Sequence, residues 1–242
     1  MLTTEQQTDR ATCITATDMG AILGVNKYRS PIDVWLHKTG RGPAHVGNER
    51  TKWGDLLEPV IRDDYAERHR CIVRQVGTVI GEYGNVRISA TPDGVVEPTH
   101  GLEIKTHSVY AAEYGRPGSD DVPPHIAVQC HVGMLVLGIA EWHLVAFRDG
   151  VPTDYVIRAD DAAHREMVAF AQHWWTTYVV GHAMPPTTGS EADGAALRAA
   201  FPGIKRADPV YTPADDRAMV DIASLQEARR ERRIAELQEE AA

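Results

Sequence analysis

The chain has 242 residues, of which 43% are hydrophobic and 24% charged, as expected for a globular protein with one large domain or one domain and an appendage. The formal net charge of −9 argues against a surface that is basic throughout, although a basic face for nucleic acid is compatible with an acidic total. The cysteines contain no CxxC pair, so the sequence gives no sign of a zinc ribbon, an iron–sulfur cluster or a disulfide framework. No apolar run is long enough to cross a bilayer and the N-terminus lacks a basic–apolar leader, so we expect a cytoplasmic protein.

Helices dominate the first part of the chain. Apolar spacing, caps and breakers predict helices over residues 15–24, 30–38 and 48–69. Thr17 or Asp18 is the expected cap of the first helix, and Ser30, followed by a proline, caps the second. Pro59 should kink or split the third helix, because proline removes an intrahelical hydrogen bond.

The periodicity then changes to the alternation of strands. Strands are predicted over residues 71–81, 85–91, 94–97 and 102–106, separated by Gly, Asn and Pro. A buried helix over 125–138 follows, and the segments WHLVAF and DYVIR are two strands joined by an Asp-Gly turn near 149–150. A long helix is expected over 159–181.

Strands flanked by helices on both sides indicate an α/β or α+β fold with a central mixed β-sheet. We expect this domain over residues 1–185, a linker over 186–212 and a charged C-terminal helix over 213–242. We favour a solvated, weakly packed helix for this last segment, with a coiled coil as the alternative.

The stretch ATPDGVVEPTHGLEIKT, residues 90–106, carries charges where apolar residues dominate. Glu103 and Lys105 point to the same face of a strand, and a hairpin can bring Asp93 beside Glu103. Two facing carboxylates repel each other unless a cation or a shared proton lies between them. Mg²⁺ prefers carboxylate oxygens and water, and a neighbouring ammonium can orient an attacking water. This set predicts a site for phosphodiester hydrolysis, although a cross-strand ion pair explains Glu103 and Lys105 equally well.

The same residues match the PD-(D/E)xK nuclease signature, with Pro92-Asp93 followed after nine residues by Glu103-Ile104-Lys105. Further blocks are ITATDMGAILGVNKYRSPIDVW, the helix NERTKWGDLLEP with Glu58, and the helix IAVQCHVGMLVLG with Gln129. Over about residues 10–180 this order resembles the YqaJ-like viral recombinase family, which includes phage lambda exonuclease. Five separated blocks in the same order make the match specific.

The resemblance implies a restriction-endonuclease-like core and a role for each matching residue. Asp93 and Glu103 would bind metal together with the carbonyl of Ile104 and with Glu58, while Lys105 would activate the attacking water. Gln129 would help to order the site. Three residues fall where the family places a pocket for a 5′-phosphate: Arg10, Thr17 and Thr91. The lambda enzyme has serines where this chain has the two threonines.

Simpler interpretations of these residues stay open. Glu58 can be a solvated helix residue, Gln129 can satisfy backbone groups in a buried helix, and Thr17 can be a cap. The histidines lack the paired spacing of a zinc site. In the loop after the lysine, we regard three side chains as candidates for contact with DNA: Tyr110, Tyr114 and Arg116.

The resemblance implies a Mg²⁺-dependent deoxyribonuclease, with Mn²⁺ as a substitute, that acts as a 5′-to-3′ exonuclease on double-stranded DNA ends. It would produce 3′ single strands for a single-strand annealing protein in phage-type recombination, encoded by a phage or prophage. Relatives assemble as rings, commonly trimers, around the duplex. The alternatives are an endonuclease or nickase on the same core, and a non-catalytic DNA-binding or assembly module.

Overall fold

The computed structural model describes residues 11–43, 49–97, 99–107 and 114–201, all within one compact unit that spans Met1–Pro202. Three sequence predictions lie outside the described residues: the phosphate contact at Arg10, the DNA contact at Tyr110 and the C-terminal helix over 213–242.

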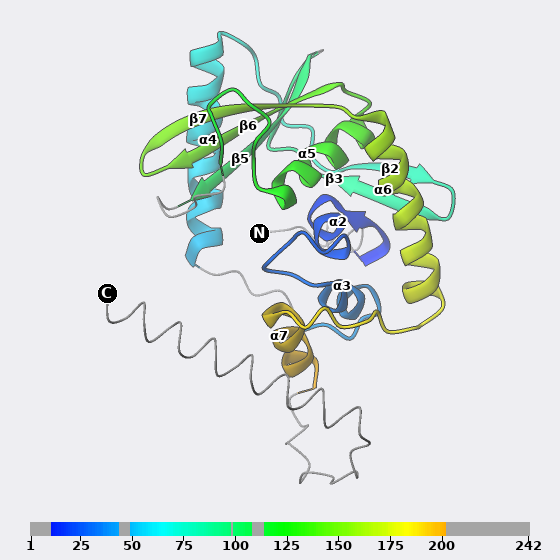
Figure 1. Cartoon of the computed structure of the whole chain (residues 1–242). Helices are drawn as coiled ribbons and strands as arrows, with labels where there is room; N and C mark the ends of the chain where they lie inside the picture. The colour runs from blue at the N-terminus through cyan, green and yellow to red at the C-terminus, as the bar shows by residue number, and fades with distance from the viewer. Residues whose placement is uncertain (1–10, 44–48, 98, 108–113, 202–242) are drawn as a thin grey trace, which may run out of the picture. The chain divides into compact units, whose positions relative to one another are not determined.

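Helices precede, separate and follow two runs of strands along the described chain (Figure 1). In order, the elements are β1 (Ile14–Thr15), α2 (Ala16–Ile22), α3 (Pro31–Lys38), α4 (Glu49–His69), β2 (Val79–Tyr83), β3 (Val86–Ala90), β4 (Gly94–Val96), β5 (His100–His107), α5 (Pro124–Leu137), β6 (Glu141–Arg148), β7 (Val151–Arg158), α6 (Asp161–Trp174), the π-helix η1 (Trp175–Val180) and α7 (Glu191–Ala200).

The strands form two mixed sheets instead of one. The smaller sheet has the order β1-β3-β2, and the larger has the order β4-β5-β6-β7. β5 pairs with β6 in parallel, whereas β4 and β7 are antiparallel to their neighbours. The expected mixed α/β architecture is confirmed, but the long strand predicted over 71–81 is wrong in its first part, since β2 begins at Val79 and residues 71–78 carry an isolated bridge at Arg74.

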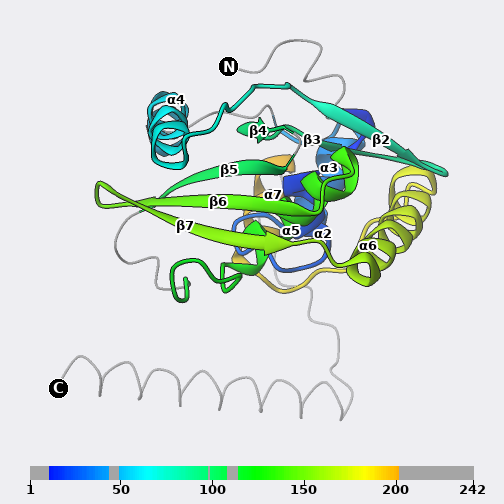
Figure 2. The ribbon, with the colours of Figure 1, turned by 90° about the horizontal axis from the view of Figure 1, so that it is seen from above.

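The two faces of the larger sheet are covered by different helices. On one face, α5 packs over the alternate β6 residues Trp142, Leu144 and Ala146. On the other face, α4 covers Leu102, Ile104 and Val145. Figure 2 shows β4, β5, β6 and β7 side by side in this order. A residue on β5 therefore faces α4 or α5 according to the strand alternation.

The cap of the first helix is an earlier residue than predicted. Thr15 is the N-cap of α2, because its Oγ1 accepts a hydrogen bond from the Asp18 N–H at 3.1 Å, and the Asp18 carboxylate accepts the Thr15 N–H at 3.1 Å. The expectation that Thr17 or Asp18 caps this helix is wrong, and the Thr17 hydroxyl has no part in the cap. Ser30 caps α3 as predicted.

α4 runs through Pro59 as one helix of 21 residues, so the predicted split does not occur. The predicted linker over 186–212 also differs in part from the structure. Residues 191–200 form α7, whose Ala196 is buried in the same apolar cluster as residues of α3. Ser190 caps α7 through its contact with the Asp193 N–H, a start signal that the sequence analysis missed.

A tryptophan separates α5 from the larger sheet. A Cβ atom on Gly101 of β5 would lie 2.4 Å from the Trp142 ring, and one on Gly133 of α5 would lie 2.2 Å from it. Both positions therefore need glycine, because the indole fills the space where another side chain would begin. The indole is 1% exposed and sets the distance between helix and sheet.

Within the described ranges, no helix combines the length and the apolar character that a membrane crossing requires.

Candidate active site

Asp93 lies at the end of the β4–β5 hairpin, where the pairing of β5 with β4 stops. β4 pairs with β5 only as far as Leu102, and the Asp93 N–H donates to the Leu102 carbonyl at 3.1 Å. One step further along β5, the Ile104 N–H donates to Asp93 Oδ2 at 2.6 Å. A residue's N–H and C=O point to the same edge of a strand, so the Ile104 carbonyl also faces this edge. The hairpin thus holds a carboxylate and a backbone carbonyl beside each other, as the signature predicted.

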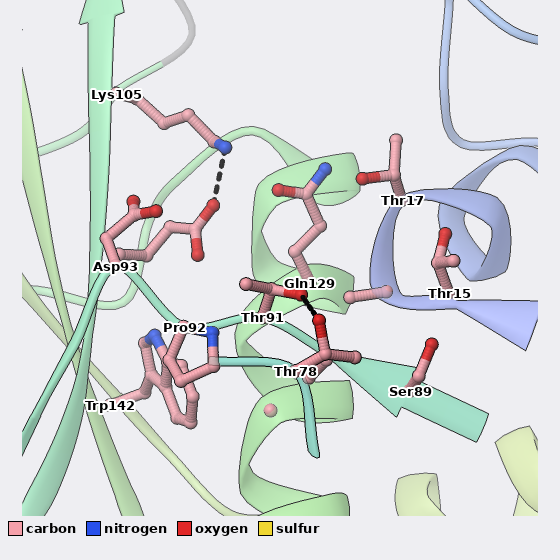
Figure 3. Close-up of a pocket in the computed structure, with 14 residues that line it drawn as sticks. Thr15, Thr17, Thr78, Ser89, Thr91, Pro92, Asp93, Lys105, Gln129 and Trp142 are labelled. Carbon is pink, nitrogen blue, oxygen red and sulfur yellow. Dashed lines mark hydrogen bonds and ion pairs between the residues drawn. The ribbon is translucent and has the colours of Figure 1, made fainter. Parts of the chain in front are cut away.

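Glu103 and Lys105 lie on the α5 face of β5, beside Asp93. Lys105 Nζ lies 2.5 Å from Glu103 Oε1, and the Glu103 side chain is 12% exposed. All three side chains line a pocket of about 180 Å³ between the two sheets (Figure 3). Because strand alternation puts residues 103 and 105 on one face, the charged pair points into the pocket while Ile104 packs under α4.

Hydroxyl groups line the other side of the pocket. Thr17 and Thr91, both predicted to contact phosphate, are among them. The sequence analysis missed three more: Thr15, Thr78 and Ser89. The Oγ1 atoms of Thr78 and Thr91 are 2.8 Å apart. Ser89 pairs with Thr15 across β1 and β3, so the small sheet presents these groups together.

Gln129 enters the pocket from α5. Figure 3 shows its amide between the carboxylates of the β5 side and the Thr17 hydroxyl of α2. Gln129 is half-buried, and its amide can both donate and accept hydrogen bonds. The structure thus brings six predicted side chains together in one pocket, from α2, β5, α5 and the loop between β3 and β4: Thr17, Thr91, Asp93, Glu103, Lys105 and Gln129.

Glu58 lies beside the pocket, not within its lining. Its Oε1 accepts a hydrogen bond from Arg62 Nη1 at 3.0 Å, and the same Nη1 donates to the backbone carbonyl of Asp93 at 2.9 Å. Arg62, whose side chain is 11% exposed, therefore ties Glu58 to the Asp93 peptide. The sequence analysis missed Arg62, although its position four residues after Glu58 on a helix was a signal for an ion pair.

The site carries more negative than positive charge. Burial, followed by the charge of Glu103, raises the pKa of Asp93 well above its ordinary value, and Glu58 adds to the effect. Burial alone would lower the pKa of Lys105, but the charges of Glu103 and Asp93 outweigh it and raise the pKa, so the amine is an ammonium. Three carboxylates here face two cations, Lys105 and Arg62. One negative charge is left without a partner among the described residues.

The donor types around Asp93 suit a hard divalent cation, but the carboxylate oxygens of Asp93, Glu103 and Glu58 do not all lie within 4.8 Å of one another. The available donors are carboxylate oxygens of Asp93, Glu103 and Glu58 and the carbonyl of Ile104, which are the oxygen ligands that Mg²⁺ and Mn²⁺ accept. The excess negative charge and the raised pKa of Asp93 both reflect repulsion between neighbouring carboxylates, which a bound cation would reduce. Among the described residues, the group of three whose ligand atoms all lie within 4.8 Å of one another is a different one: His100, Glu141 and His143. That group lies on the α4 side of the sheet, away from the pocket.

The two described candidates for DNA contact behave differently. Tyr114 packs against Tyr155, with ring centroids 5.3 Å apart, and Arg148 lies over its ring. It is therefore part of the apolar cluster under α5, not a free aromatic surface. Arg116 is exposed.

Known proteins resemble both this sequence and this fold. Residues 6–140 match the YqaJ-like viral recombinase domain family. The YqaJ protein of Bacillus subtilis (strain 168), described as uncharacterized, is 26% identical over 190 residues, which cover 76% of this chain and 59% of the relative. The chain thus spans about three fifths of the length of that curated relative.

Solved structures share the fold at low identity. The alkaline exonuclease LHK-Exo from Laribacter hongkongensis has a TM-score of 0.58 at 22% identity, covering 74% of this chain and 94% of that one. Its complex with dAMP gives 0.60 at 23% over the same shares. A phage-related exonuclease from Haemophilus somnus 129PT gives 0.53 at 10%, covering 71% of this chain and 96% of that one. The fold is that of the PD-(D/E)xK phage-type exonucleases, and this chain belongs to the YqaJ-like viral recombinase domain family.

Proposed function

We propose that this protein is a divalent-metal-dependent deoxyribonuclease, and specifically a 5′-to-3′ exonuclease on double-stranded DNA ends that uses Mg²⁺. The observation that carries the proposal is the convergence of Asp93, Glu103 and Lys105 in one pocket, with an excess of negative charge. The family match and the shared fold with exonucleases, one of them solved with dAMP, support it.

In this proposal, Asp93, Glu103, Glu58 and the Ile104 carbonyl hold the metal ions. Two bound ions would stabilise the charge that develops on the attacking and leaving oxygens of the phosphodiester. Asp93 is oriented for this role by the Ile104 N–H, and Glu58 is oriented by Arg62. Hydrogen bonds of this kind fix the direction of the carboxylate lone pairs before the substrate arrives.

Lys105 and Gln129 act on the water and the phosphate. The Lys105 ammonium can donate to the attacking water or to a non-bridging phosphate oxygen, which orients the first and neutralises charge on the second. Gln129 can donate from its amide nitrogen and accept at its amide oxygen, so it can hold the water and a phosphate oxygen together. Both side chains reach the pocket from elements that are themselves packed in the core.

The hydroxyl wall is the proposed seat of the terminal 5′-phosphate. Thr17 and Thr91 lie across the pocket from the carboxylates, and their hydroxyls can donate to phosphate oxygens. Thr78 shares a hydrogen bond with Thr91 and so orients it. Arg10 would supply the positive charge that this wall lacks.

The biological setting that we propose is recombination of the phage type, with the DNA duplex as substrate. A trimeric ring would gather basic groups around the duplex, and a single-strand annealing protein would receive the 3′ strand. A phage or prophage gene product working in the bacterial cytoplasm fits this setting.

The test is digestion of a linear duplex labelled at either end, with and without a 5′-phosphate, in Mg²⁺ and in EDTA. We expect loss of the 5′-terminal nucleotide first, faster with the 5′-phosphate, and no digestion in EDTA. Covalently closed plasmid should stay intact. Cleavage of closed plasmid at a comparable rate would replace the exonuclease by an endonuclease, and no cleavage of any DNA would leave a binding module.

A further inference from the structure

A buried tyrosine on α4 contacts two histidines of the sheet. The Tyr65 hydroxyl lies 2.8 Å from His100 Nε2 on β5 and 2.6 Å from His143 Nδ1 on β6. The two imidazole rings are stacked, with centroids 3.8 Å apart and planes 16° from parallel. Tyr65 is fully buried, and burial raises the pKa of its phenol, so the hydroxyl keeps its proton at neutral pH. It can therefore donate to one imidazole and accept from the other.

The remaining ring nitrogens also have partners. His100 Nδ1 lies 2.9 Å from Thr99 Oγ1, and His143 Nε2 lies 3.1 Å from Glu141 Oε1. His100, Glu141 and His143 have ligand atoms within 4.8 Å of one another, and hydrogen bonds to Tyr65 and between His143 and Glu141 join them in this structure. The group is a closed polar network around Tyr65.

α4 depends on such polar contacts for its placement. Along the described residues of this helix only Ile61 and Tyr65 are buried hydrophobic side chains, and three apolar residues are exposed: Trp53, Leu56 and Val60. Pro59 removes one intrahelical hydrogen bond directly after Glu58. The apolar contact between this helix and the sheet is made by Leu57, Ile61 and Tyr65, and directional polar contacts add to it in deciding where each turn lies.

The network and Glu58 share the inner face of α4. The Cβ position of Gly54 lies 3.7 Å from Thr106 Oγ1, while Tyr65 contacts His100, so the helix runs antiparallel to β5. With a rise of about 1.5 Å per helix residue and about 3.3 Å per strand residue, Glu58 lies level with about residue 104. Tyr65 follows Glu58 by seven residues, or about two turns, on the same side of the helix.

We propose that Tyr65, His100 and His143 are positioning residues that fix α4 on the sheet and thereby hold Glu58 beside Asp93 at the edge of β5. The inference rests on the proposed function, because it needs Glu58 to be a metal ligand. Arg62 then completes the alignment locally, one turn after Glu58, through its contact with the Asp93 carbonyl. His69 and Arg68 extend the attachment to Asp154 of β7.

The test compares Mn²⁺ binding by isothermal titration calorimetry, without DNA, in the whole chain and in two variants. Tyr65→Phe keeps the ring and removes only the hydroxyl, and we expect it to weaken Mn²⁺ binding about 10-fold, the lower end of the effect of outer-shell partners. Glu58→Gln should weaken binding at least as much. The double variant should lose no more than Glu58→Gln alone, because Tyr65 acts through Glu58. Additive losses, or Mn²⁺ binding by Tyr65→Phe equal to that of the unchanged chain, would overturn the inference.

Tyr83→Phe is the matched control, because it removes another tyrosine hydroxyl, which donates to the Leu135 carbonyl at 3.1 Å. It should reduce stability without changing Mn²⁺ affinity. If Tyr65→Phe does not fold, His100→Gln serves instead, since it removes one of the two partners of Tyr65, with a smaller loss of Mn²⁺ affinity expected. Unchanged Mn²⁺ affinity in a folded His100→Gln would count against the inference.

The same titrations separate this inference from the proposed function. If the unchanged chain binds Mn²⁺ and degrades DNA while Tyr65→Phe behaves identically, only the positioning role fails. If the unchanged chain neither binds Mn²⁺ nor degrades DNA, the proposed function fails and the inference with it. Zn²⁺ binding that survives Asp93→Asn and disappears in His143→Gln would instead show a metal site at the histidines and overturn the network.

Discussion

Asp18 is buried and Asp93 is half-buried in the wall of the pocket, and their pKa values move in opposite directions. For Asp18, the raising effect of burial is outweighed by Lys38 and Arg29, each with a nitrogen 2.6 Å from a carboxylate oxygen, and the pKa is lowered. For Asp93, burial and the neighbouring carboxylates outweigh Lys105, and the pKa is raised. Burial is common to both, so the balance of neighbouring charges decides the direction.

The count of charges explains this difference. Around Asp18, two carboxylates (with Asp33) meet two cations, whereas around Asp93 three carboxylates meet two. A balanced group needs nothing from outside the chain and can serve stability. A group with excess negative charge is held together by the rest of the fold, and binding an external cation stabilises it. The following predictions test this contrast, starting with the largest expected effect.

Asp93→Asn should abolish metal-dependent DNA degradation, by about a thousand-fold or more, because several kcal/mol of charge stabilisation in the transition state depend on the bound metal. The free energy of unfolding, measured with urea in EDTA, should stay the same or rise, since a repulsive charge is removed. A large loss of stability together with retained activity would reverse the roles assigned to the two groups.

Asp18→Asn should do the opposite. It leaves Arg29 and Lys38 without their buried partner, and breaking such a pair costs about 3–5 kcal/mol. Urea unfolding measures this loss. Asp33→Asn, at a carboxylate with 21% side-chain exposure, is the control and should cost less. Equal costs at the two positions would contradict the importance of the buried pair.

Saturating Mn²⁺ should stabilise the unchanged chain by about 2.7 kcal/mol at a concentration 100 times the Kd, because the ion binds the folded state. The measurement is the shift of the thermal midpoint on adding Mn²⁺, reversed by EDTA. Asp18→Asn should show the same shift from a lower starting midpoint, and Asp93→Asn should show none. A shift that survives in Asp93→Asn would place the ion elsewhere.

Acid should destabilise the chain partly through Asp18. Its pKa is lower in the folded than in the unfolded state, so the unfolded state binds the proton first as the pH falls. The stabilisation is complete above the unfolded pKa of about 3.9 and is lost below it, by at most about 1.4 kcal/mol per pH unit. The slope of the free energy of unfolding against pH is measured by urea unfolding at intervals of about one pH unit between pH 5 and pH 2. The slope should be shallower in Asp18→Asn, and an equal slope would assign the acid loss to other groups.

The sequence was most informative where local rules determine the contact. Strand alternation places Glu103 and Lys105 on one face, and the hairpin brings Asp93 beside them. The family resemblance, and not a local rule, predicted that Gln129 and Thr17 reach the site. In contrast, the Thr78–Thr91 contact depends on how the chain enters β2, and no local pattern reveals it.

Long-range contacts that neither a local pattern nor the family resemblance indicated were not predictable. The histidines appeared scattered because Tyr65 lies 35 and 78 residues from the two that it contacts. The division of the strands into two sheets likewise depends on long-range pairing, including the parallel pairing of β1 with β3. The capping of α2 by Thr15 was a local feature, but three neighbouring residues all had capping side chains.

The Trp142 indole between Gly101 and Gly133 has a consequence for variation within the chain. Gln129 precedes Gly133 by one turn of α5, so any side chain added at either glycine would lift the helix and withdraw the amide from the carboxylates. These two glycines therefore let α5 lie close enough to the sheet for Gln129 to enter the pocket. Natural variants with a larger residue at either position would need a smaller side chain at position 142 to keep the same distance between helix and sheet.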